Sequence, residues 1–404
     1  MKNKKVIFSI LDTPAFGGAE QYMYTHLKFL SESGFDVVLG AKNAEVRRVM
    51  NERLTEAEKK KFKIIRAPYR LDPCGNWKGL VKFFPAAPRA LIWCYLTLNH
   101  LKKNYEQIIC LWPGWADRSL FSPIAKHFDC PVIWIEFGTI ENTYKRGFGF
   151  PKPLFQFFSA YADHLITSSE YTKKSIMKHS RFKGDNISLV YPGTKNFSKN
   201  ELANFRNKAI TWKKENKFDK TTFIGIIGRL AHENEIDMAI KAFALYKNKH
   251  QQQKIKLLII GDGPTRSELE ELVKELKIEK DIIFAGFVNE EKKYTLLSAC
   301  TLFIFPRAWI LDGFGMTTIE AMSLGLPVLT TDFGPQVEIV TDGREGFRYK
   351  PHDSKDLAKK IEKMLLLTDK QRSAMSSQGI KRTVVFSDKN SHKAMLQVIS
   401  RFST

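Results

Sequence analysis

Two acids bracket a glycine loop in the last quarter of the chain. Asp312 precedes Gly313 and Gly315, and Glu320 follows them about one turn into an apolar run. Glycines let a backbone approach a ligand closely, and the run TIEAMSL predicts a helix that ends at Gly325. Open amides at a helix start suit an anionic diphosphate, and carboxylates with no cation nearby suit sugar hydroxyls. The segment therefore predicts a cradle for a phosphate and a sugar, with a plain glycine turn before a half-buried helix as the alternative.

Two further glycines and one arginine follow strand-like segments. Gly17 and Gly18 form the pair in DTPAFGGAEQY after the first predicted strand, and Arg229 closes the run FIGIIGR. A glycine turn before a helix can bring the backbone against a phosphate or a sugar, although close packing of a helix on a strand requires the same residues. The forked, permanent cation of arginine suits a diphosphate, although arginine after a strand also forms ordinary surface ion pairs.

Strand-like and helix-like segments alternate along all 404 residues, which predicts parallel sheets with helices on both faces. A chain of this length exceeds one ordinary core. The predicted fold class is α/β, with two doubly wound Rossmann-like domains that face each other across a cleft. Strands are predicted at residues 4–11, 36–41, 107–112, 131–137, 164–169 and 187–193, and again at 221–229, 255–263, 281–288, 301–306 and 327–332.

The predicted domain boundaries follow this alternation. Residues 1–195 form an N-terminal Rossmann-like domain, the polar residues 196–220 a linker, and residues 221–385 a C-terminal Rossmann-like domain. Residues 386–404 are predicted as a helix that crosses back to the N-terminal domain. Since ligands of such sheets bind beyond the carboxyl ends of the strands, the cleft is the expected site.

The net charge of +21 is concentrated in the first half of the chain, where residues 1–199 contribute +14. Between Lys59 and Lys103, basic residues alternate with aromatic and aliphatic ones. This pattern predicts contact with an anionic membrane surface, with a solvated basic face over a core helix as the alternative. Nucleic acid is not an expected partner, because no zinc finger, RNA-recognition signature or basic heptad helix is present.

A cytoplasmic protein, peripheral on the inner face of the membrane, is the expected localisation. The longest apolar runs, such as LIWCYLTL, are shorter than the roughly 18 residues that a membrane span needs, and the basic N-terminus leads into a strand rather than a secretion signal. Five scattered cysteines fit a reducing compartment. With no HExxH motif, Asp-x-Asp pair or histidine cluster in the sequence, no metal is predicted.

Four segments of the second half resemble one family. GRLAHENEIDMAIKAF, LLIIGDGPTRSELEELV, IIFAGFV and residues 313–347 are similar, in order and spacing, to the donor-binding half of the GT-B retaining glycosyltransferases of family 4, the glycosyl transferases group 1. FGGAEQYMYTHLKFLSESGFDV resembles the acceptor half. The resemblance implies transfer of a sugar from a UDP- or GDP-linked donor to a hydroxyl of a glycan or lipid-linked acceptor, in polysaccharide or glycolipid biosynthesis. It also implies retained anomeric configuration, with neither a metal nor another cofactor.

The resemblance implies a role for each matching residue. Arg229 would bind the donor phosphates and Glu320 the ribose hydroxyls. Asp312 matches the first of the family's two acids, where a glutamate is usual, so its carboxylate reaches less far. Backbone amides would contact the sugar and the phosphates from Gly313, Phe314, Gly315, Met316 and Thr317.

Three departures from the family pattern concern the site. Asn234 stands in the donor site where a lysine is usual, which removes one cation from the phosphates. Two extra residues before Asp312 allow Arg307 or Trp309 to enter the site. Glu136 stands near the reacting centre, where the family commonly has a histidine before a glycine.

A front-face substitution, in which the departing diphosphate accepts the proton of the incoming hydroxyl, requires no protein nucleophile. Arg229 and the helix amides would then stabilise the charge that develops on the leaving group. Glu136 as nucleophile or base is one alternative, and Glu136 as a ligand of an acceptor hydroxyl or a cation is another. Two other classes of function stay open: a nucleotide-sugar-binding protein without transfer activity, and a basic scaffold associated with membranes or nucleic acids.

Overall fold

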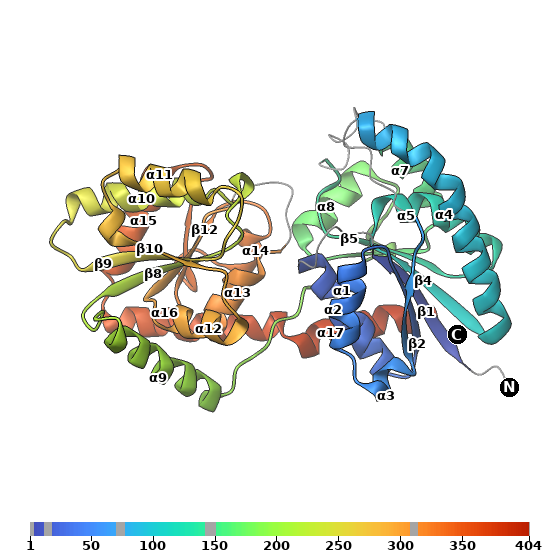
Figure 1. Cartoon of the computed structure of the whole chain (residues 1–404), viewed down its shortest axis with the longest axis horizontal. Helices are drawn as coiled ribbons and strands as arrows, with labels where there is room; N and C mark the ends of the chain where they lie inside the picture. Colours follow the sequence, from blue (N-terminus) through green and yellow to red (C-terminus); the bar gives the residue numbers. More distant parts are fainter. Residues whose placement is uncertain (1–3, 12–17, 70–76, 142–150, 308–313, 404) are drawn as a thin grey trace. The chain divides into compact units, whose positions relative to one another are not determined.

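The computed structural model describes residues 4–11, 18–69, 77–141, 151–307 and 314–403. Contacts between residues divide the chain into two compact units. Unit 1 comprises Met1–Gly193 together with Ser391–Thr404, and unit 2 comprises Thr194–Asn390. Each unit contains one parallel sheet with helices on both faces (Figure 1). The prediction of two doubly wound Rossmann-like domains is therefore confirmed.

The sheet of unit 1 has seven strands in the order β3-β2-β1-β4-β5-β6-β7, and all neighbouring strands are parallel. This order reverses direction between β1 and β4, so the carboxyl ends of these two strands form the switch point at which ligands of doubly wound sheets bind. The strands are β1 (Lys5–Leu11), β2 (Asp36–Ala41), β3 (Phe62–Arg66), β4 (Gln107–Trp112), β5 (Val132–Glu136), β6 (His164–Thr167) and β7 (Ile187–Leu189).

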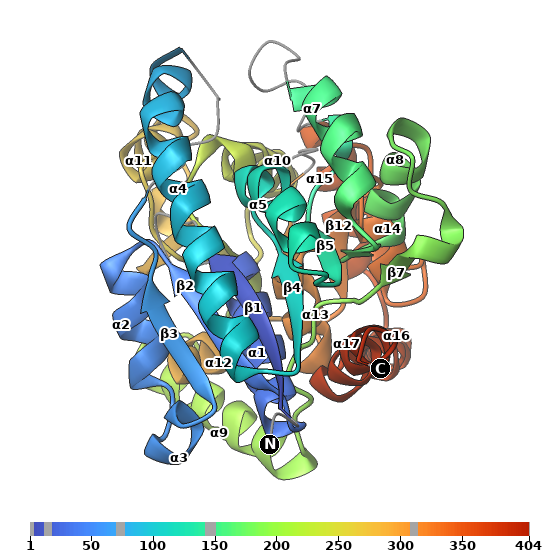
Figure 2. The same ribbon diagram turned by 90° about the vertical axis from the view of Figure 1, so that its right-hand side faces the viewer.

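Helices cover both faces of this sheet. On one face, α4 and α5 lie over the strands β1 and β4 (Figure 2), and α7 belongs to the same apolar core. On the other face, α1, α2 and α17 share a second core. The helices of unit 1 are α1 (Gly18–Glu32), α2 (Ala44–Glu52), α3 (Glu56–Lys59), α4 (Trp77–Asn104), α5 (Trp115–His127), α7 (Pro151–Phe158) and α8 (Glu170–His179), and α17 (Asp388–Ser400) joins them from Ser391 onward.

The sheet of unit 2 has six parallel strands in the order β10-β9-β8-β11-β12-β13. The strands are β8 (Thr222–Ile227), β9 (Ile255–Ile260), β10 (Ile282–Gly286), β11 (Leu302–Phe305), β12 (Val328–Thr331) and β13 (Gly346–Tyr349). The helices are α9 (Lys199–Glu215), α10 (Ile236–Lys249), α11 (Arg266–Glu275), α12 (Glu290–Ser298), α13 (Met316–Ser323), α14 (Gln336–Ile339), α15 (Ser354–Leu365) and α16 (Asp369–Thr383).

Two strands escaped the sequence analysis, and both lie at sheet edges. β3 has the sequence FKIIR, in which Lys63 and Arg66 are exposed and Phe62 is buried. Charged residues are common on edge strands, where they discourage pairing with other chains. β13 has only four residues and follows a turn directly. Segments this short, with charged residues in them, show too little alternation of apolar and polar residues to be predicted as strands.

The segment 196–220, interpreted from the sequence as a linker, contains helix α9 and belongs to unit 2. A capping box between Ser198 and Glu201 begins the helix. The rings of Phe197 and Phe205 pack on Tyr294 of α12, with centroids 4.8 and 5.4 Å apart. These contacts make the segment part of the folded unit, despite its polar composition.

Two buried histidines make unit 1 sensitive to acid. His26 of α1 is fully buried, and its ring nitrogens lie 2.8 Å from the carbonyl oxygen of Tyr22 and 3.0 Å from Oγ of Ser391. Burial lowers the pKa of His26 to about 4, with the nearby ring of His392 acting in the same direction and the hydrogen bonds to Tyr22 and Ser391 in the opposite one. Burial also lowers the pKa of His164, in β6, to about 4. The folded unit therefore holds both rings neutral at pH values where the unfolded chain binds protons.

We expect unit 1 to lose stability as the pH falls from about 6.5 to about 4, by about 3 kcal/mol for His26. The sign follows because the unfolded chain takes up this proton near pH 6.5, whereas the folded chain does so only near pH 4. Urea unfolding across this range measures the loss. The variant His26→Gln is expected to flatten the pH dependence, and His100→Gln, at an exposed position of α4, is the control. An equally steep dependence for His26→Gln and the unmodified chain would contradict this assignment.

Candidate active site

Arg229 is presented by a loop that is fixed at both of its ends. The loop follows β8, and the amide of Gly228 donates to the carbonyl oxygen of Ile260 at 3.1 Å. The amide of Leu230 donates to the carbonyl oxygen of Asp262 at 3.0 Å. Between these two anchors, the side chain of Arg229 is exposed. The carboxyl edge of the sheet in unit 2 thus holds a cation that is open to solvent.

Two glycines after β9 permit this backbone pairing. A Cβ atom at Gly261, which has a φ of +135°, would lie 2.0 Å from the carbonyl oxygen of Gly228. A Cβ atom at Gly263 would lie 2.3 Å from the carbonyl oxygen of Leu230. Since both contacts are to backbone atoms that cannot move aside, the motif GDG sets the position of the arginine loop.

Asn234 supports the same loop. Its side-chain amide donates to the carbonyl oxygen of Arg229 at 2.5 Å. The following residue, Glu235, has a left-handed backbone with φ of 49° and begins α10. The carboxylate of Glu235 is 2.9 Å from Nδ1 of His352. The side chain of Asn234 is therefore turned toward the backbone of Arg229, which is a supporting contact that the sequence did not reveal.

Helix α13 begins at the same edge of the sheet, after the neighbouring strand β11. Its N-cap, Gly315, is left-handed with φ of +85°, and no side chain caps the helix. Phe314 is buried, with its ring 5.2 Å from that of Phe386. Within the part of the chain that the structure describes, the amides of Met316 and Thr317 donate to no acceptor. The helix start therefore offers open donors, as the sequence analysis expected of an anion site.

Gln336 holds this helix start in place. Its side-chain amide donates to the carbonyl oxygen of Phe314 at 3.3 Å and accepts from Oγ1 of Thr318 at 3.0 Å. A Cβ atom at Gly315 would lie 2.0 Å from Nε2 of Gln336. Because Gln336 is only 3% exposed and makes both bonds, it cannot turn away without breaking them. Gly315 is thus required both by its backbone angle and by its neighbour.

We expect Gly315→Ala to destabilise the chain by about 2–3 kcal/mol, from the left-handed backbone and from the collision with Gln336. Scanning calorimetry measures this loss. Gly343→Ala is the matched control, because Gly343 has a φ of +79° and nothing lies within 4 Å of an added Cβ. It should cost only about 1–2 kcal/mol. Equal losses for the two variants would contradict the role given to Gln336.

Glu320 lies on α13, one turn beyond the open amides. Its Oε1 is 2.9 Å from Nζ of Lys293 on α12, and both side chains are 20% exposed. Lys293 also lies over the ring of Tyr294, 4.4 Å from its centroid. Glu320 is therefore held in one position by a half-buried cation, so the expectation of a carboxylate with no cation nearby was wrong for this residue. Lys293 was not recognised in the sequence, because the two residues are 27 positions apart and no local pattern joins them.

Arg307 follows β11 and adds a second cation at this edge. Burial lowers the pKa of Arg307 to about 10, and the carboxylates of Glu233 and Glu235 act in the opposite direction. The carbonyl oxygen of Arg307 accepts from Oγ1 of Thr331 at 2.9 Å. The sequence analysis allowed Arg307 to enter the site, and its guanidinium does lie near the acids that follow the Arg229 loop. Trp309, the other residue considered there, lies outside the described residues.

The carboxyl edge of unit 2 brings together Arg229, Glu320 and the start of α13, among the residues that the structure describes. Strands β8 and β11 are hydrogen-bonded neighbours and parallel, so the segments that follow them meet at one edge of the sheet. Arg229 follows the first strand, and Glu320 and the open amides of α13 follow the second. The predicted residues Asp312 and Gly313 lie outside the described residues, as does Gly17 in unit 1.

In unit 1, Glu136 ends strand β5 and forms a buried ion pair with Arg118. Its Oε2 is 2.8 Å from a terminal nitrogen of Arg118, and Oε1 accepts from the amide of Gly138 at 3.2 Å. Glu136 is 8% and Arg118 3% exposed. Arg118 also donates to the carbonyl oxygen of Ile135 at 3.1 Å. The carboxylate is therefore already paired with a cation from α5, which the sequence analysis did not identify.

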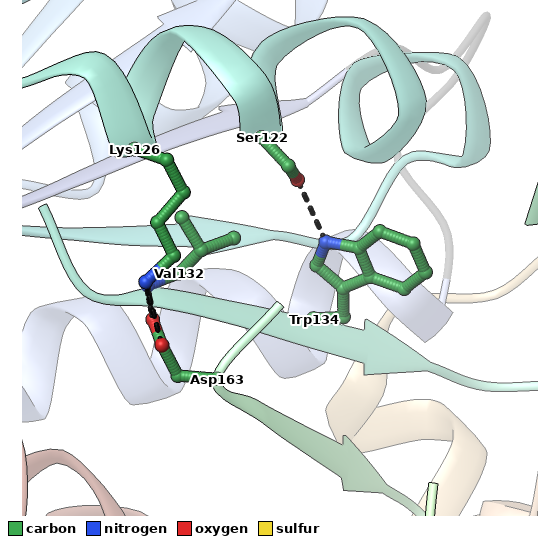
Figure 3. A network of polar contacts seen from close by, with 5 residues as sticks. All are labelled: Ser122, Lys126, Val132, Trp134 and Asp163. Atoms are coloured by element: carbon green, nitrogen blue, oxygen red, sulfur yellow. Dashed lines mark hydrogen bonds and ion pairs between the residues drawn. The ribbon is translucent and has the colours of Figure 1, made fainter. Parts of the chain in front are cut away.

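Helix α5, which carries Arg118, is fixed to the sheet by polar contacts (Figure 3). Nε1 of Trp134 donates to Oγ of Ser122 at 2.8 Å. At the other end of the helix, Lys126 pairs with Asp163 at 2.5 Å, and Asp163 also accepts from the amide of Val132 at 2.7 Å. These contacts hold α5 against β5, so the ion pair of Arg118 and Glu136 has a rigid frame.

A second buried pair lies one residue away on α5. Oδ1 of Asp117 is 3.3 Å from Nζ of Lys42, after β2, and 3.3 Å from the hydroxyl of Tyr69, after β3. Lys42 lies 4.5 Å from the centroid of the Tyr69 ring. Both charged groups are almost fully buried. The carboxyl edge of unit 1 thus holds two neighbouring ion pairs, which no motif in the sequence indicated.

Gly18, predicted to contact a ligand, begins helix α1. A Cβ atom there would meet nothing within 4 Å, and its φ is not in the left-handed region. Within the described residues, no close approach of another backbone explains a glycine at this position.

Comparison with known proteins gives one family. Residues 207–382 match the family model described as glycosyl transferases group 1. An uncharacterized glycosyltransferase, MJ1059, of Methanocaldococcus jannaschii is 31% identical over 206 residues, which cover 50% of this chain and 48% of that protein. The N-acetylgalactosamine-N,N'-diacetylbacillosaminyl-diphospho-undecaprenol 4-alpha-N-acetylgalactosaminyltransferase of Campylobacter jejuni is 26% identical, over 56% of each chain. The matched stretches thus span about half the length of these curated relatives.

The fold of the whole chain has solved counterparts. The crystal structure of Alr3699/HepE from Anabaena in complex with UDP superposes with a TM-score of 0.77 at 15% sequence identity. The superposition covers 98% of this chain and all of the other. At this identity the likeness concerns the fold, which is the GT-B fold of glycosyltransferases. Among the described residues, no helix combines the length and the apolar character that crossing a bilayer demands.

Proposed function

We propose that the chain is a glycosyltransferase that uses a nucleotide-sugar donor, because it belongs, through residues 207–382, to the family of glycosyl transferases group 1. The observation that carries this proposal is the arrangement at the carboxyl edge of unit 2. Arg229 is exposed there, and the adjoining segment offers the open amides of Met316 and Thr317 followed by Glu320. The cation and the amides are groups that bind a diphosphate, and the carboxylate is a group that accepts hydrogen bonds from sugar hydroxyls.

In this proposal, Arg229 and the amides of α13 bind the donor diphosphate, and Glu320 accepts bonds from the ribose hydroxyls. Asn234 holds the backbone of Arg229, and Lys293 orients Glu320. Arg307 adds positive charge at the same edge, in place of the lysine that the family usually has at position 234. UDP is the favoured nucleotide over GDP, with support from the complex of the structurally similar Anabaena protein with UDP.

We further propose a retaining, front-face transfer with no metal and no other cofactor. The departing diphosphate takes the proton from the acceptor hydroxyl as the glycosidic bond forms, so the protein supplies position and charge rather than a nucleophile. The acceptor is a glycan or a lipid-linked glycan, which unit 1 would bind. The lipid-linked acceptor in the name of the Campylobacter relative supports this choice.

A ligand screen by thermal unfolding tests the proposal. A ligand at one hundred times its dissociation constant stabilises the folded chain by about 2.7 kcal/mol. We expect UDP and one UDP-sugar to raise the unfolding temperature and ADP to leave it unchanged. Slow release of sugar from the stabilising donor should follow, since water can replace the acceptor. Stabilisation without any release or transfer would instead favour a nucleotide-sugar-binding protein that lacks transfer activity.

A further inference from the structure

Helix α4 has an unusual distribution of side chains over its described part. Its inner stripe of Ala90, Cys94 and Leu98 is fully buried against the sheet. Its outer stripe exposes Ile92 to 60% and Leu96, one turn later, to 58%. Leu98 packs into the core beside the smaller Ala90 and Cys94, while two further large aliphatic residues of the helix face outward. The exposure of Ile92 and Leu96 departs from the usual pattern, in which burial of large apolar side chains stabilises a fold.

Cations lie at both ends of this outer stripe. Arg89 precedes Ile92 by three positions, and Lys103 follows Leu96 by seven, so both continue the stripe. Both are exposed, and neither forms an ion pair with any residue for which the structure gives a position. The sequence of α4 contains no Asp or Glu over its 28 residues. The helix therefore presents an apolar centre between positive ends, with no acidic residue to repel an anionic surface.

Other exposed apolar side chains lie on this face of the sheet, on α4 itself and on α7. Helix α5 packs against both α4 and α7. Tyr95 of α4 is 44% exposed, with its ring 5.1 Å from that of Phe128. Helix α7 also lacks acidic residues and exposes Phe157 to 61%. Figure 2 shows α4 as the long outer helix of this layer.

We propose that the outer face of α4 docks onto an anionic lipid bilayer, with the helix lying along the interface. Ile92 and Leu96 would enter the boundary between headgroups and acyl chains, and Arg89 and Lys103 would contact the anionic headgroups. An interfacial helix of this kind needs an apolar stripe and flanking cations together. A nucleic-acid surface would match the cations but would leave the aliphatic centre unexplained. The charge of the first half of the chain, +14 over residues 1–199, adds a long-range attraction of the same sign.

Co-sedimentation of the full chain with vesicles tests this docking. We expect binding to vesicles of phosphatidylcholine mixed with phosphatidylglycerol at low salt, and little binding to phosphatidylcholine alone. The double variant Ile92→Ser/Leu96→Ser should weaken binding about tenfold or more. The double variant Arg89→Gln/Lys103→Gln should weaken it about fivefold per cation. Ile210→Ser, at a 64% exposed position of α9 in unit 2, is the matched control and should bind as the unmodified chain does.

Three results would overturn the docking surface. The first is absence of binding to the anionic vesicles at low salt. The second is loss of binding in the charge variant alone, with Ile92→Ser/Leu96→Ser unchanged, which would mean a general electrostatic attraction. The third is binding to duplex DNA, and not to vesicles, that the same variants abolish. The thermal shift produced by UDP should be equal in all variants, because its proposed site is in unit 2. This inference rests on contacts of unit 1 alone, so the vesicle experiment can still be interpreted if UDP proves not to bind.

Discussion

Arg229→Ala is expected to lower kcat/KM for sugar transfer about 10- to 150-fold, which corresponds to about 1.5–3 kcal/mol. The variant removes the exposed, forked cation from the arginine loop, and with it a charge-assisted contact to the leaving diphosphate. Steady-state kinetics with the donor identified by the thermal screen provide the measurement. Arg229→Lys should lower kcat/KM less, because lysine keeps the positive charge and lacks only the forked pair of hydrogen-bond donors of the guanidinium.

Arg181→Ala is the control for this variant, since Arg181 is exposed in unit 1 and pairs with no acid in the described segments. It should transfer sugar at the unmodified rate. Both variants should unfold at the same temperature as the unmodified chain, because neither side chain is buried. An unchanged kcat/KM for Arg229→Ala would remove the arginine from the donor site.

Glu136→Ala is expected to destabilise the chain by about 3–5 kcal/mol, because it leaves the guanidinium of Arg118 buried without its carboxylate. Urea unfolding measures the loss. The double variant Arg118→Met/Glu136→Leu should recover most of the stability, since it removes both charges from the apolar surroundings. A loss of less than 1 kcal/mol in Glu136→Ala would contradict a structural role for the pair.

Glu136→Gln separates the structural role of this residue from a chemical one. The amide keeps the shape of the side chain and can still accept a bond from Arg118. If the carboxylate acts only as the partner of Arg118, the rate of transfer per folded molecule should stay close to that of the unmodified chain, and only the free energy of unfolding should fall. A variant as stable as the unmodified chain, with transfer abolished, would instead assign Glu136 to the reaction as nucleophile or base.

Much of the fold could be predicted because its central strands are continuous apolar runs. FIGI and LLII are buried on both faces of a parallel sheet, and such apolar runs are recognisable as strands in a sequence. Gly325, predicted to end α13, follows that helix with a φ of +82°. Edge strands were missed, because β3 and β13 are short and bear charges.

The site was predictable only where its residues are neighbours in the chain. The turn at Gly315 and the acid at Glu320 belong to one segment, so their spacing was informative. The pairs of Lys293 with Glu320 and of Arg118 with Glu136 join residues 27 and 18 positions apart. A single sequence shows which residues are charged, but it does not show which of them form ion pairs in the folded chain. The contact of Asn234 with the backbone of Arg229 joins residues only five positions apart, yet it was not foreseen, because it depends on the local path of the loop and not on a sequence pattern.

The most direct test of the account is a crystal structure of the chain with a bound UDP-sugar. We predict that the diphosphate contacts the guanidinium of Arg229 and the backbone amides of Met316 and Thr317, and that the ribose hydroxyls donate to Glu320. A diphosphate bound elsewhere on the chain, with the side chain of Arg229 still in solvent, would contradict the central claim.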